Sequence, residues 1–263
     1  MPRLNTDIDE PVQQRDFISS LAKGLEVLRA FDQESTELST ADLAKKLGIS
    51  RASARRFLLT LTGLGYLRRN GQYFQPTSKV LSLSAVFFSS TPLSTLAQPY
   101  LEQVTRRTEE SCSLGILENN MVVFVARSQA RWILIPGLRV GSALPAYCTA
   151  IGRVLLAALP ENELAHYLQM TEPKPLSERT VIRKSELREL IADVRQQGYS
   201  IVDQELEQGL RSIAVPIVQD GRTIASISVA SHVSRATLKR MKQEFLPVLR
   251  EAASEISAEL SRS

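Results

Sequence analysis

Cysteine and histidine are scarce in this chain, which has two of each among its 263 residues. Cys112 and Cys148 are too few for a disulfide framework, and their positions lack the spacing of metal ligands. Because both lie among apolar or small residues, we expect them to be buried free thiols. His166 and His232 are isolated as well, so neither a structural zinc site nor another bound metal or cofactor is expected.

Long hydrophobic runs are also missing. No apolar stretch reaches the roughly 20 residues that cross a bilayer, and the polar N-terminus lacks the apolar centre of a signal peptide. We therefore expect a cytoplasmic protein with no membrane contact. The hydrophobic content of 43% and the charged content of 23% are ordinary for a globular protein that folds in water.

Acidic side chains are absent from one long segment. Between Asp42 and Glu102 the sequence contains no aspartate or glutamate, although the formal net charge of the whole chain is only +4. The basic residues of this segment are Lys45, Lys46, Arg51, Arg55, Arg56, Arg68, Arg69 and Lys79. A polyanion such as DNA would be attracted to this segment and not to the rest of the chain.

Residues 38–66, inside that segment, show the pattern of two helices joined by a tight turn. Ser39 with Asp42 predicts a capping box at the start of the first helix, and Gly48 is placed to end it. Ser50 is placed to cap the second helix. The second helix has apolar residues at the spacing of one buried face and arginines on the other side. The apolar residues are Ala54, Phe57, Leu58 and Leu61.

Two structures fit this pattern, namely a helix-turn-helix that recognises DNA and an ordinary helical hairpin with a solvated basic face. Asn70-Gly71, between two arms that contain aromatic residues, predicts a β-hairpin directly after the second helix. An earlier helix is expected from about Phe17 to Phe31, with an apolar stripe of Leu21, Leu25 and Leu28. Three helices followed by a basic hairpin predict a winged helix-turn-helix.

The order of expected elements predicts an α+β chain in four parts. These are a disordered arm (1–16), the winged helix-turn-helix (17–76), a linker helix (77–91) and a second domain (92–263). The linker helix is apolar nearly all round, so it packs either against a partner subunit or within its own chain. In the second domain we expect strands at 111–118, 121–127, 132–135, 199–202, 213–218 and 223–230, and helices at 93–108, 150–159, 161–168, 186–197 and 235–260.

The second domain shows no catalytic motif, so we do not expect an enzyme. It has no phosphate-binding glycine loop and no Gly-x-Ser-x-Gly elbow. Asp203 and Glu205 are near enough in sequence for paired-carboxylate chemistry, but no nucleophile accompanies them. Cys148-Thr149, just before an expected helix, favours a sensor, because free N–H groups at a helix start can receive a ligand carboxylate. A plain threonine cap without a ligand has the same pattern.

Four segments of the chain resemble the IclR family of bacterial transcriptional regulators. They are residues 20–28, the helix-turn-helix, residues 144–157 and residues 203–217. The likeness is greatest to the branch that controls protocatechuate and 4-hydroxybenzoate genes of the β-ketoadipate pathway. The resemblance implies an N-terminal winged helix-turn-helix, a linker helix and a C-terminal domain with a GAF/profilin-like antiparallel sheet and helices. It also implies a homodimer or tetramer, double-stranded operator DNA and a small carboxylate or aromatic-acid effector.

Site residues follow from the pattern and the resemblance together. The expected DNA contacts are Lys45, Ser50, Arg51, Ala52, Ser53, Arg55, Arg56, Arg68 and Arg69. The effector contacts that the resemblance implies are Leu144, Ala150, Ile151, Asp203, Ser212, Ser228 and Ala230, where Ala230 replaces a serine of the family. Thr149, at the expected helix start, is added to them. Arg211 either pairs with a ligand carboxylate or makes a structural salt bridge.

Two rival functions are compatible with the same sequence. One is an enzyme that acts on a small carboxylate and uses its winged helix for protein contacts. The other is a DNA-binding protein whose second domain serves only as an assembly platform.

Overall fold

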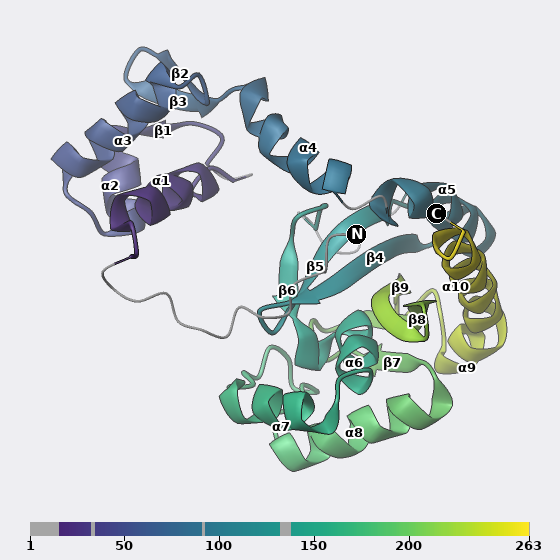
Figure 1. Ribbon diagram of the computed structural model, residues 1–263. Coiled ribbons are helices and arrows are strands. Elements are labelled where there is room, and N and C mark those ends of the chain that lie inside the picture. Colours follow the sequence, from purple (N-terminus) through teal and green to yellow (C-terminus); the bar gives the residue numbers. More distant parts are fainter. Residues whose placement is uncertain (1–15, 33–34, 91–92, 132–137, 263) are drawn as a thin grey trace. The chain divides into compact units, whose positions relative to one another are not determined.

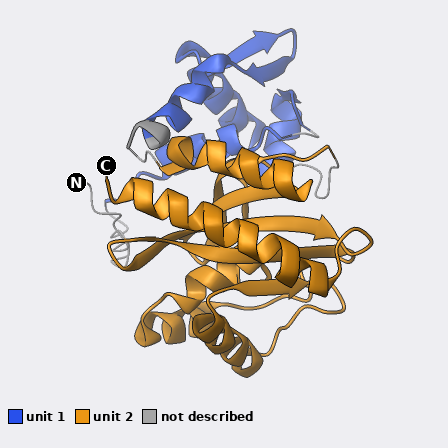
Figure 2. Ribbon diagram, turned by 90° about the vertical axis from the view of Figure 1, so that its right-hand side faces the viewer, with its two compact units in different colours: residues 1–91 blue, residues 92–263 orange. Residues whose placement is uncertain are grey.

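The computed structural model describes residues 16–32, 35–90, 93–131 and 138–262. The chain divides into unit 1, Met1–Thr91, and unit 2, Pro92–Ser263 (Figures 1 and 2). The expected arm over 1–16 lies almost wholly outside the described residues, as do the strand expected at 132–135 and the break at Thr91-Pro92. None of the helices in the described parts of the chain is long and apolar enough to cross a membrane.

Unit 1 has the winged helix-turn-helix arrangement that the sequence predicts. Its helices and strands are α1 (Ser19–Arg29), β1 (Leu38–Ser39), α2 (Thr40–Leu47), α3 (Arg51–Gly63), β2 (Leu67–Asn70) and β3 (Tyr73–Pro76). The strands form a small antiparallel sheet in the order β1-β3-β2. Its core unites all of these elements through Val27, Leu38, Leu43, Leu58, Leu67 and Phe74. A 3-10 turn (Ser78–Val80) and helix α4 (Leu81–Ser90) follow.

The wing turn lies one residue later than predicted. Asn70 pairs with Tyr73 as the last rung of the ladder, so Gly71 and Gln72 form the two-residue turn. Gly71 has a φ of +61° and Gln72 does not have a positive φ. A glycine at the first central position of a two-residue hairpin turn meets this backbone requirement without steric cost.

The stripe of Leu21, Leu25 and Leu28 on α1 is the second difference from expectation. Leu21 is 61% and Leu25 is 51% exposed, whereas the helix buries Val27 completely. Helix α1 therefore enters the unit 1 core on one side and presents an apolar face on another. This face is a candidate contact surface, because large exposed apolar patches are uncommon on isolated soluble proteins.

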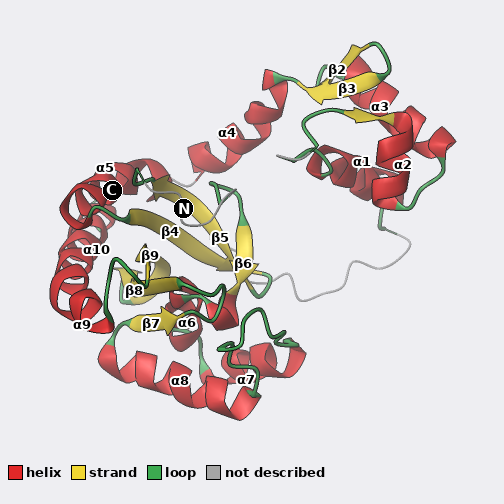
Figure 3. Ribbon diagram, turned by 180° about the vertical axis from the view of Figure 1, so that it is seen from behind, coloured by secondary structure: helices red, strands yellow, loops and turns green. Residues whose placement is uncertain are grey.

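Unit 2 is a six-stranded antiparallel sheet with helices on both faces (Figure 3). The strand order is β6-β5-β4-β9-β8-β7. The strands are β4 (Ser111–Glu118), β5 (Met121–Ser128), β6 (Ala143–Pro145), β7 (Ser200–Asp203), β8 (Leu210–Gln219) and β9 (Arg222–His232). The hairpins β4–β5 and β8–β9 were predicted from turn residues, whereas the three-residue edge strand β6 was not.

The two faces of this sheet are covered by different helices. Helices α5 (Leu93–Thr108) and α10 (Leu246–Leu260) cover one face, and α6 (Ala150–Ala157) covers the other. Helices α7 (Glu161–Met170) and α8 (Lys184–Gln197) lie beyond α6 on the same side (Figures 1 and 3). The final helix is not continuous, because α9 (Leu238–Arg240) and a π-helical segment (Met241–Phe245) precede α10. We call the face under α6 the inner face. Its apolar core includes Val122, Phe124, Ile151, Val202 and Ala214.

The start of α6 is packed unusually tightly. The 3-10 turn Ala146–Cys148 folds back onto the first residues of α6. A Cβ atom on Gly152 would lie 2.2 Å from the carbonyl oxygen of Ala146 and 2.4 Å from its Cα. Only glycine allows this approach, so the position of the helix start depends on the absence of a side chain at residue 152.

We therefore expect Gly152→Ala to lower the free energy of unfolding by about 3 kcal/mol, the upper end for overpacking, because the obstructing atoms are backbone. Gly24→Ala is the control, since a Cβ there has nothing within 4 Å. That change lies inside α1 and should stabilise by roughly 0.5–1 kcal/mol. Urea denaturation followed by circular dichroism measures both, and equal stability of Gly152→Ala and wild type would contradict the packing argument.

Candidate DNA-binding surface and effector site

Both helices of the helix-turn-helix begin at the predicted caps. The N–H of Asp42 donates to Ser39 Oγ at 3.2 Å, and the N–H of Ser39 donates to Asp42 Oδ2 at 3.0 Å. The hydrogen bonds from Ser39 hold the pKa of the Asp42 carboxyl below its usual value. Gly48 ends α2 with a φ of +63°, and Ser50 Oγ accepts the N–H of Ser53 at 3.1 Å. The capping predictions are confirmed.

Helix α3 has one buried and one exposed face. Ala54 and Leu58 are fully buried in the unit 1 core. Arg51, Ala52 and Arg55 are exposed on the other side, and the two arginines have no hydrogen bond or ion pair to any described residue. Unpaired arginines on an exposed helix face can place their guanidinium groups against phosphates or base edges.

The other basic side chains of unit 1 differ in whether they have intramolecular partners. Lys45 and Arg56 are exposed, but Lys46, which was not among the expected contacts, is paired with Asp32 at 2.5 Å. On the wing, Arg68 Nε donates to Gln75 Oε1 at 3.1 Å. Arg69 Nε donates to the carbonyl of Gly71 at 2.8 Å, and its guanidinium lies 6.0 Å from the Phe74 ring centre. Each wing arginine keeps its terminal nitrogens available for phosphate.

An apolar groove of about 660 Å³ lies within unit 1. Helices α1, α3 and α4 contribute to it, with Leu83 as the contribution of α4. Its lining is mostly aliphatic and aromatic, and the members are Leu21, Leu25, Leu28, Phe57, Leu61, Leu64, Tyr66 and Leu83, with Ser20, Gly24, Ser53, Arg56 and Thr60. The exposed stripe of α1 forms one side of this groove.

In unit 2, the start of α6 has the cap that the sequence predicts. Thr149 Oγ1 accepts the N–H of Gly152 at 3.2 Å and donates to the carbonyl of Pro145 at 3.1 Å. The N–H groups of Ala150 and Ile151 have no hydrogen bond to any described residue. Backbone donors of this kind at a helix start attract anionic groups.

The sheet register brings several expected effector contacts onto the inner face. Ser212 lies opposite Ala230, and Ser228 lies opposite both Ala214 and Ser113. Leu144 pairs with Val122 and packs against the core beneath α6. The hydroxyls of Ser212 and Ser228 have no hydrogen bond to any described residue. Leu144, Ser212, Ser228 and Ala230 therefore share the face that α6 covers.

Asp203 is not brought together with these residues. It follows Val202 on β7 and lies opposite Arg211, so the strand alternation places it on the other face from Ser212. Its Oδ1 accepts from Arg211 Nε at 2.7 Å and its Oδ2 lies 3.1 Å from Arg179 Nη1. Burial opposes its ionisation, but the hydrogen bond and charge of Arg211 outweigh burial and lower its pKa. Arg211 makes the structural salt bridge, and its Nη1 also donates to the Ala236 carbonyl.

Glu205 is likewise committed to an arginine. Its Oε2 lies 2.6 Å from Arg153 Nη2, and the two side chains are only 8% and 3% exposed. Arg153 Nε donates to the carbonyl of Tyr147 at 3.0 Å, which connects α6 to the turn before it. Since Asp203 and Glu205 each neutralise an arginine, they do not form the free carboxylate pair that acid–base catalysis needs.

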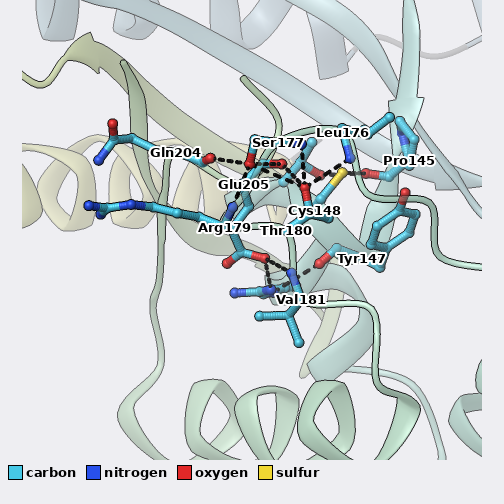
Figure 4. Close-up of polar contacts among 12 residues, drawn as sticks. Pro145, Tyr147, Cys148, Leu176, Ser177, Arg179, Thr180, Val181, Gln204 and Glu205 are labelled. Atoms are coloured by element: carbon cyan, nitrogen blue, oxygen red, sulfur yellow. Dashed lines mark hydrogen bonds and ion pairs between the residues drawn. The ribbon is translucent and has the colours of Figure 1, made fainter. Parts of the chain in front are cut away.

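The loop around residues 177–181 is fastened to the same carboxylate (Figure 4). Ser177 Oγ donates to the Gln204 carbonyl at 2.6 Å, and Thr180 Oγ1 donates to the Glu205 carbonyl at 2.6 Å. The N–H of Val181 donates to Glu205 Oε2 at 3.2 Å. These bonds and the Arg153–Glu205 pair hold the α6 start, the 177–181 loop and the end of β7 as one polar cluster.

Sequence reasoning missed Arg127, the one charged residue in the otherwise apolar and small strand β5. It lies opposite Ser113, and its Nη1 donates to Ser113 Oγ at 3.1 Å. Its Nε is buried and has no hydrogen-bond partner in the described structure. The available signal in the sequence was a single cation within a strand of apolar and small residues.

The two thiols are buried and free, as expected. Burial raises the pKa of Cys112 far above its usual value and raises that of Cys148 to about 12. Neither thiol is therefore ionised at neutral pH, and thiolate chemistry is disfavoured at both positions. Among the described residues no group of three His, Cys, Asp or Glu side chains is arranged to hold a metal ion.

Known proteins match both units. The family model described as the IclR helix-turn-helix domain matches residues 20–71, and the model described as the bacterial transcriptional regulator IclR C-terminal matches residues 85–258. The Pca regulon regulatory protein of Pseudomonas putida is 42% identical over 247 residues, which cover 93% of this chain and 85% of that protein.

Solved structures agree. A Rhodococcus sp. RHA1 protein described as a transcriptional regulator superposes with a TM-score of 0.84 at 40% identity, covering 94% of this chain and 99% of the other. An IclR homolog from Microbacterium hydrocarbonoxydans, complexed with 4-hydroxybenzoate, gives a TM-score of 0.82 at 26% identity, covering 93% and 100%.

The relatives are transcriptional regulators and not enzymes, which agrees with the absence of a catalytic motif. Together with the exposed arginines of α3 and the basic wing, the two family matches show that this chain is a DNA-binding transcriptional regulator of the IclR family.

Proposed function

We propose that this protein controls genes of aromatic-acid catabolism by binding operator DNA through unit 1 and an aromatic carboxylate through unit 2. The observation that carries the proposal is the exposed face of α3, where Arg51 and Arg55 have no hydrogen bond or ion pair to a described residue. The likeness to a Pca regulon regulatory protein supports the target genes, and the homolog with bound 4-hydroxybenzoate supports the class of effector. Because bacterial DNA lies in the cytoplasm, the protein acts there.

On DNA, α3 is the element that enters the major groove. Arg51, Ala52, Ser53 and Arg55 lie in its first two turns, which is the part of a recognition helix that contacts base edges. Arginine commonly binds guanine through two hydrogen bonds. The caps Ser39 and Ser50 hold the two helices in place, and the hydrogen bonds of Arg68 and Arg69 do the same for the wing. Phosphate contacts made by Lys45, Arg56 and the wing then orient α3 on the DNA.

In unit 2, the effector site is the inner face near the start of α6. The free amides of Ala150 and Ile151 can receive an acidic group, and the unpaired hydroxyls of Ser212 and Ser228 can bond a polar substituent. Leu144 supplies an apolar wall beside them. In this proposal Asp203 does not contact the effector. It forms ion pairs with Arg211 and Arg179 at the end of the sheet.

The regulator works as a homodimer or a dimer of dimers. Two copies of unit 1 bind two operator half-sites, and the α1 side of the apolar groove, with the stripe of Leu21 and Leu25, is the surface through which a second copy is held. An effector shifts the paired units only if it binds one arrangement more tightly than the other.

The DNA assignment predicts different effects for two arginines in a mobility-shift assay on a promoter fragment from the adjacent genes. Arg51→Ala should weaken operator binding about tenfold while leaving unrelated DNA unaffected, since it removes a base contact worth about 1–3 kcal/mol. Arg69→Ala should weaken both and reduce the slope of affinity against salt by about one. Arg106→Ala, an exposed arginine of α5, should change neither; unchanged operator binding by Arg51→Ala would refute the recognition helix.

The oligomer assignment predicts that the full chain sediments as a dimer or tetramer. Leu25→Lys places a charge in the groove and should shift sedimentation velocity toward smaller species, because a buried unpaired charge opposes association. Leu176→Lys, at a residue of unit 2 that is 45% exposed, is the control. If Leu25→Lys sediments like wild type, the groove is not the contact surface.

The effector assignment predicts heat on titration of the full chain with 4-hydroxybenzoate or protocatechuate. Ser228→Ala should lower the affinity about tenfold, equivalent to about 1.4 kcal/mol, by leaving a ligand group unpaired. Ser226→Ala is the control, because Ser226 Oγ already donates to the Val215 carbonyl at 2.9 Å. No heat with these acids or with β-ketoadipate would make unit 2 an assembly platform.

A further inference from the structure

Arg127 lies in a row of residues that crosses the inner face of the unit 2 sheet. The register runs from Arg127 on β5 to Ser113 on β4, Ser228 on β9, Ala214 on β8 and Ser200 on β7. Directly opposite residues of an antiparallel sheet point to the same side. Arg127 is therefore the one long side chain in a row whose other members are serine or alanine.

Within the part of the chain that the structure describes, this arginine has no anionic partner. Other buried or partly buried arginines of unit 2 do: Arg153 pairs with Glu205, Arg211 with Asp203 and Arg235 with Glu110. Arg127 instead makes one side-chain hydrogen bond to a neutral hydroxyl, Ser113 Oγ, and its buried Nε makes none within the described structure.

Such an arrangement costs stability unless an anion arrives. Burial lowers the pKa of the Arg127 guanidinium, yet arginine stays protonated at neutral pH. Arg127 is half-buried, and its buried Nε makes no hydrogen bond to a described residue, so an anion bound beside it would compensate its charge. Ser113 holds the guanidinium in place, so its remaining donors form a fixed fork, which matches the two oxygens of a carboxylate.

The neighbours of Arg127 in this row have small side chains, and one of them carries a second hydroxyl. Neighbouring strands are about 4.8 Å apart, so the Ser228 hydroxyl is one strand beyond Ser113 and within reach of a molecule held by Arg127. The small side chains of the row do not fill the space that a larger residue would occupy. Arg211 cannot serve instead, because it lies on the other face and is paired with Asp203.

We propose that Arg127 is the counter-charge that binds the carboxylate of the effector, with Ser113 as the residue that positions its guanidinium. The inference rests on the effector site proposed above, and it names Arg127 as the group in that site that carries a full positive charge. The amides of Ala150 and Ile151 supply partial charge only, so the acid is distinguished from a neutral analogue chiefly by Arg127.

Thermal melting of the full chain without effector gives the first test. Arg127→Met keeps the length of the side chain and removes the unpaired charge, so it should raise the melting temperature of unit 2, whereas a structural arginine would give the opposite sign. The rise in melting temperature that 4-hydroxybenzoate or protocatechuate causes in wild type should disappear in Arg127→Met. A lowered melting temperature together with an undiminished ligand-induced rise overturns the proposal.

Calorimetry gives the second test, with 4-hydroxybenzoate, protocatechuate, β-ketoadipate and the neutral 4-hydroxybenzamide as probes. Every acid that binds wild type should bind Arg127→Met at least tenfold more weakly, and the preference for 4-hydroxybenzoate over its amide should vanish. Arg127→Lys should retain part of that preference, and Ser113→Ala should weaken the acid but not the amide. Arg222→Met, at an exposed arginine of the same sheet, is the control and should behave as wild type.

These outcomes distinguish failure of the effector site from failure of the role of Arg127 within it. Wild type that binds none of the acids refutes the effector site itself, and the role of Arg127 falls with it. Wild type that binds an acid, with Arg127→Met and Arg127→Lys binding it equally well, refutes only the role of Arg127.

Discussion

The close approach of Gly152 to the Ala146 carbonyl is the constraint on which unit 2 depends. With no side chain at residue 152, the turn over Ala146–Cys148 can fold against the first turn of α6 and bring its free amides onto the sheet. Arg153, the next residue, reaches from the same turn of helix to Glu205 at the far edge of the sheet. One glycine and one buried ion pair thus locate the helix start, and the ligand-facing groups of the inner face are arranged around it.

The inner face combines two kinds of surface. Large apolar side chains, such as Phe124 and Ile151, fill the part of the sheet beneath α6 and provide the stability. Serines and alanines occupy the rows beside them, and several of their hydroxyls lack partners. Among the described residues the Ser200 hydroxyl and Arg127 Nε are buried there without a hydrogen-bond partner, and buried polar groups of this kind are uncommon unless they have a role.

Unit 1 follows a different physical plan. Its core is small and its stability depends on local devices: a capping box, a left-handed glycine, a serine cap and a hairpin turn. These devices need few long-range contacts, which leaves the outer face of α3 free for DNA. The apolar stripe of α1 remains open in the single chain, with Leu21 61% and Leu25 51% exposed.

By itself the sequence determined the local structure and the class of function. Caps, glycines and apolar periodicity act over a few residues, so the helices and both large hairpins of unit 2 were predictable. The acid-free basic segment and the family motifs, which indicate the class of function, are read from the sequence directly. Only the tertiary structure decided which side chains share a face. Strand register placed Asp203 away from Ser212, set the wing turn one residue later and put Arg127 in line with Ser113 and Ser228. Register depends on pairings between residues far apart in the chain, and local sequence does not encode these directly.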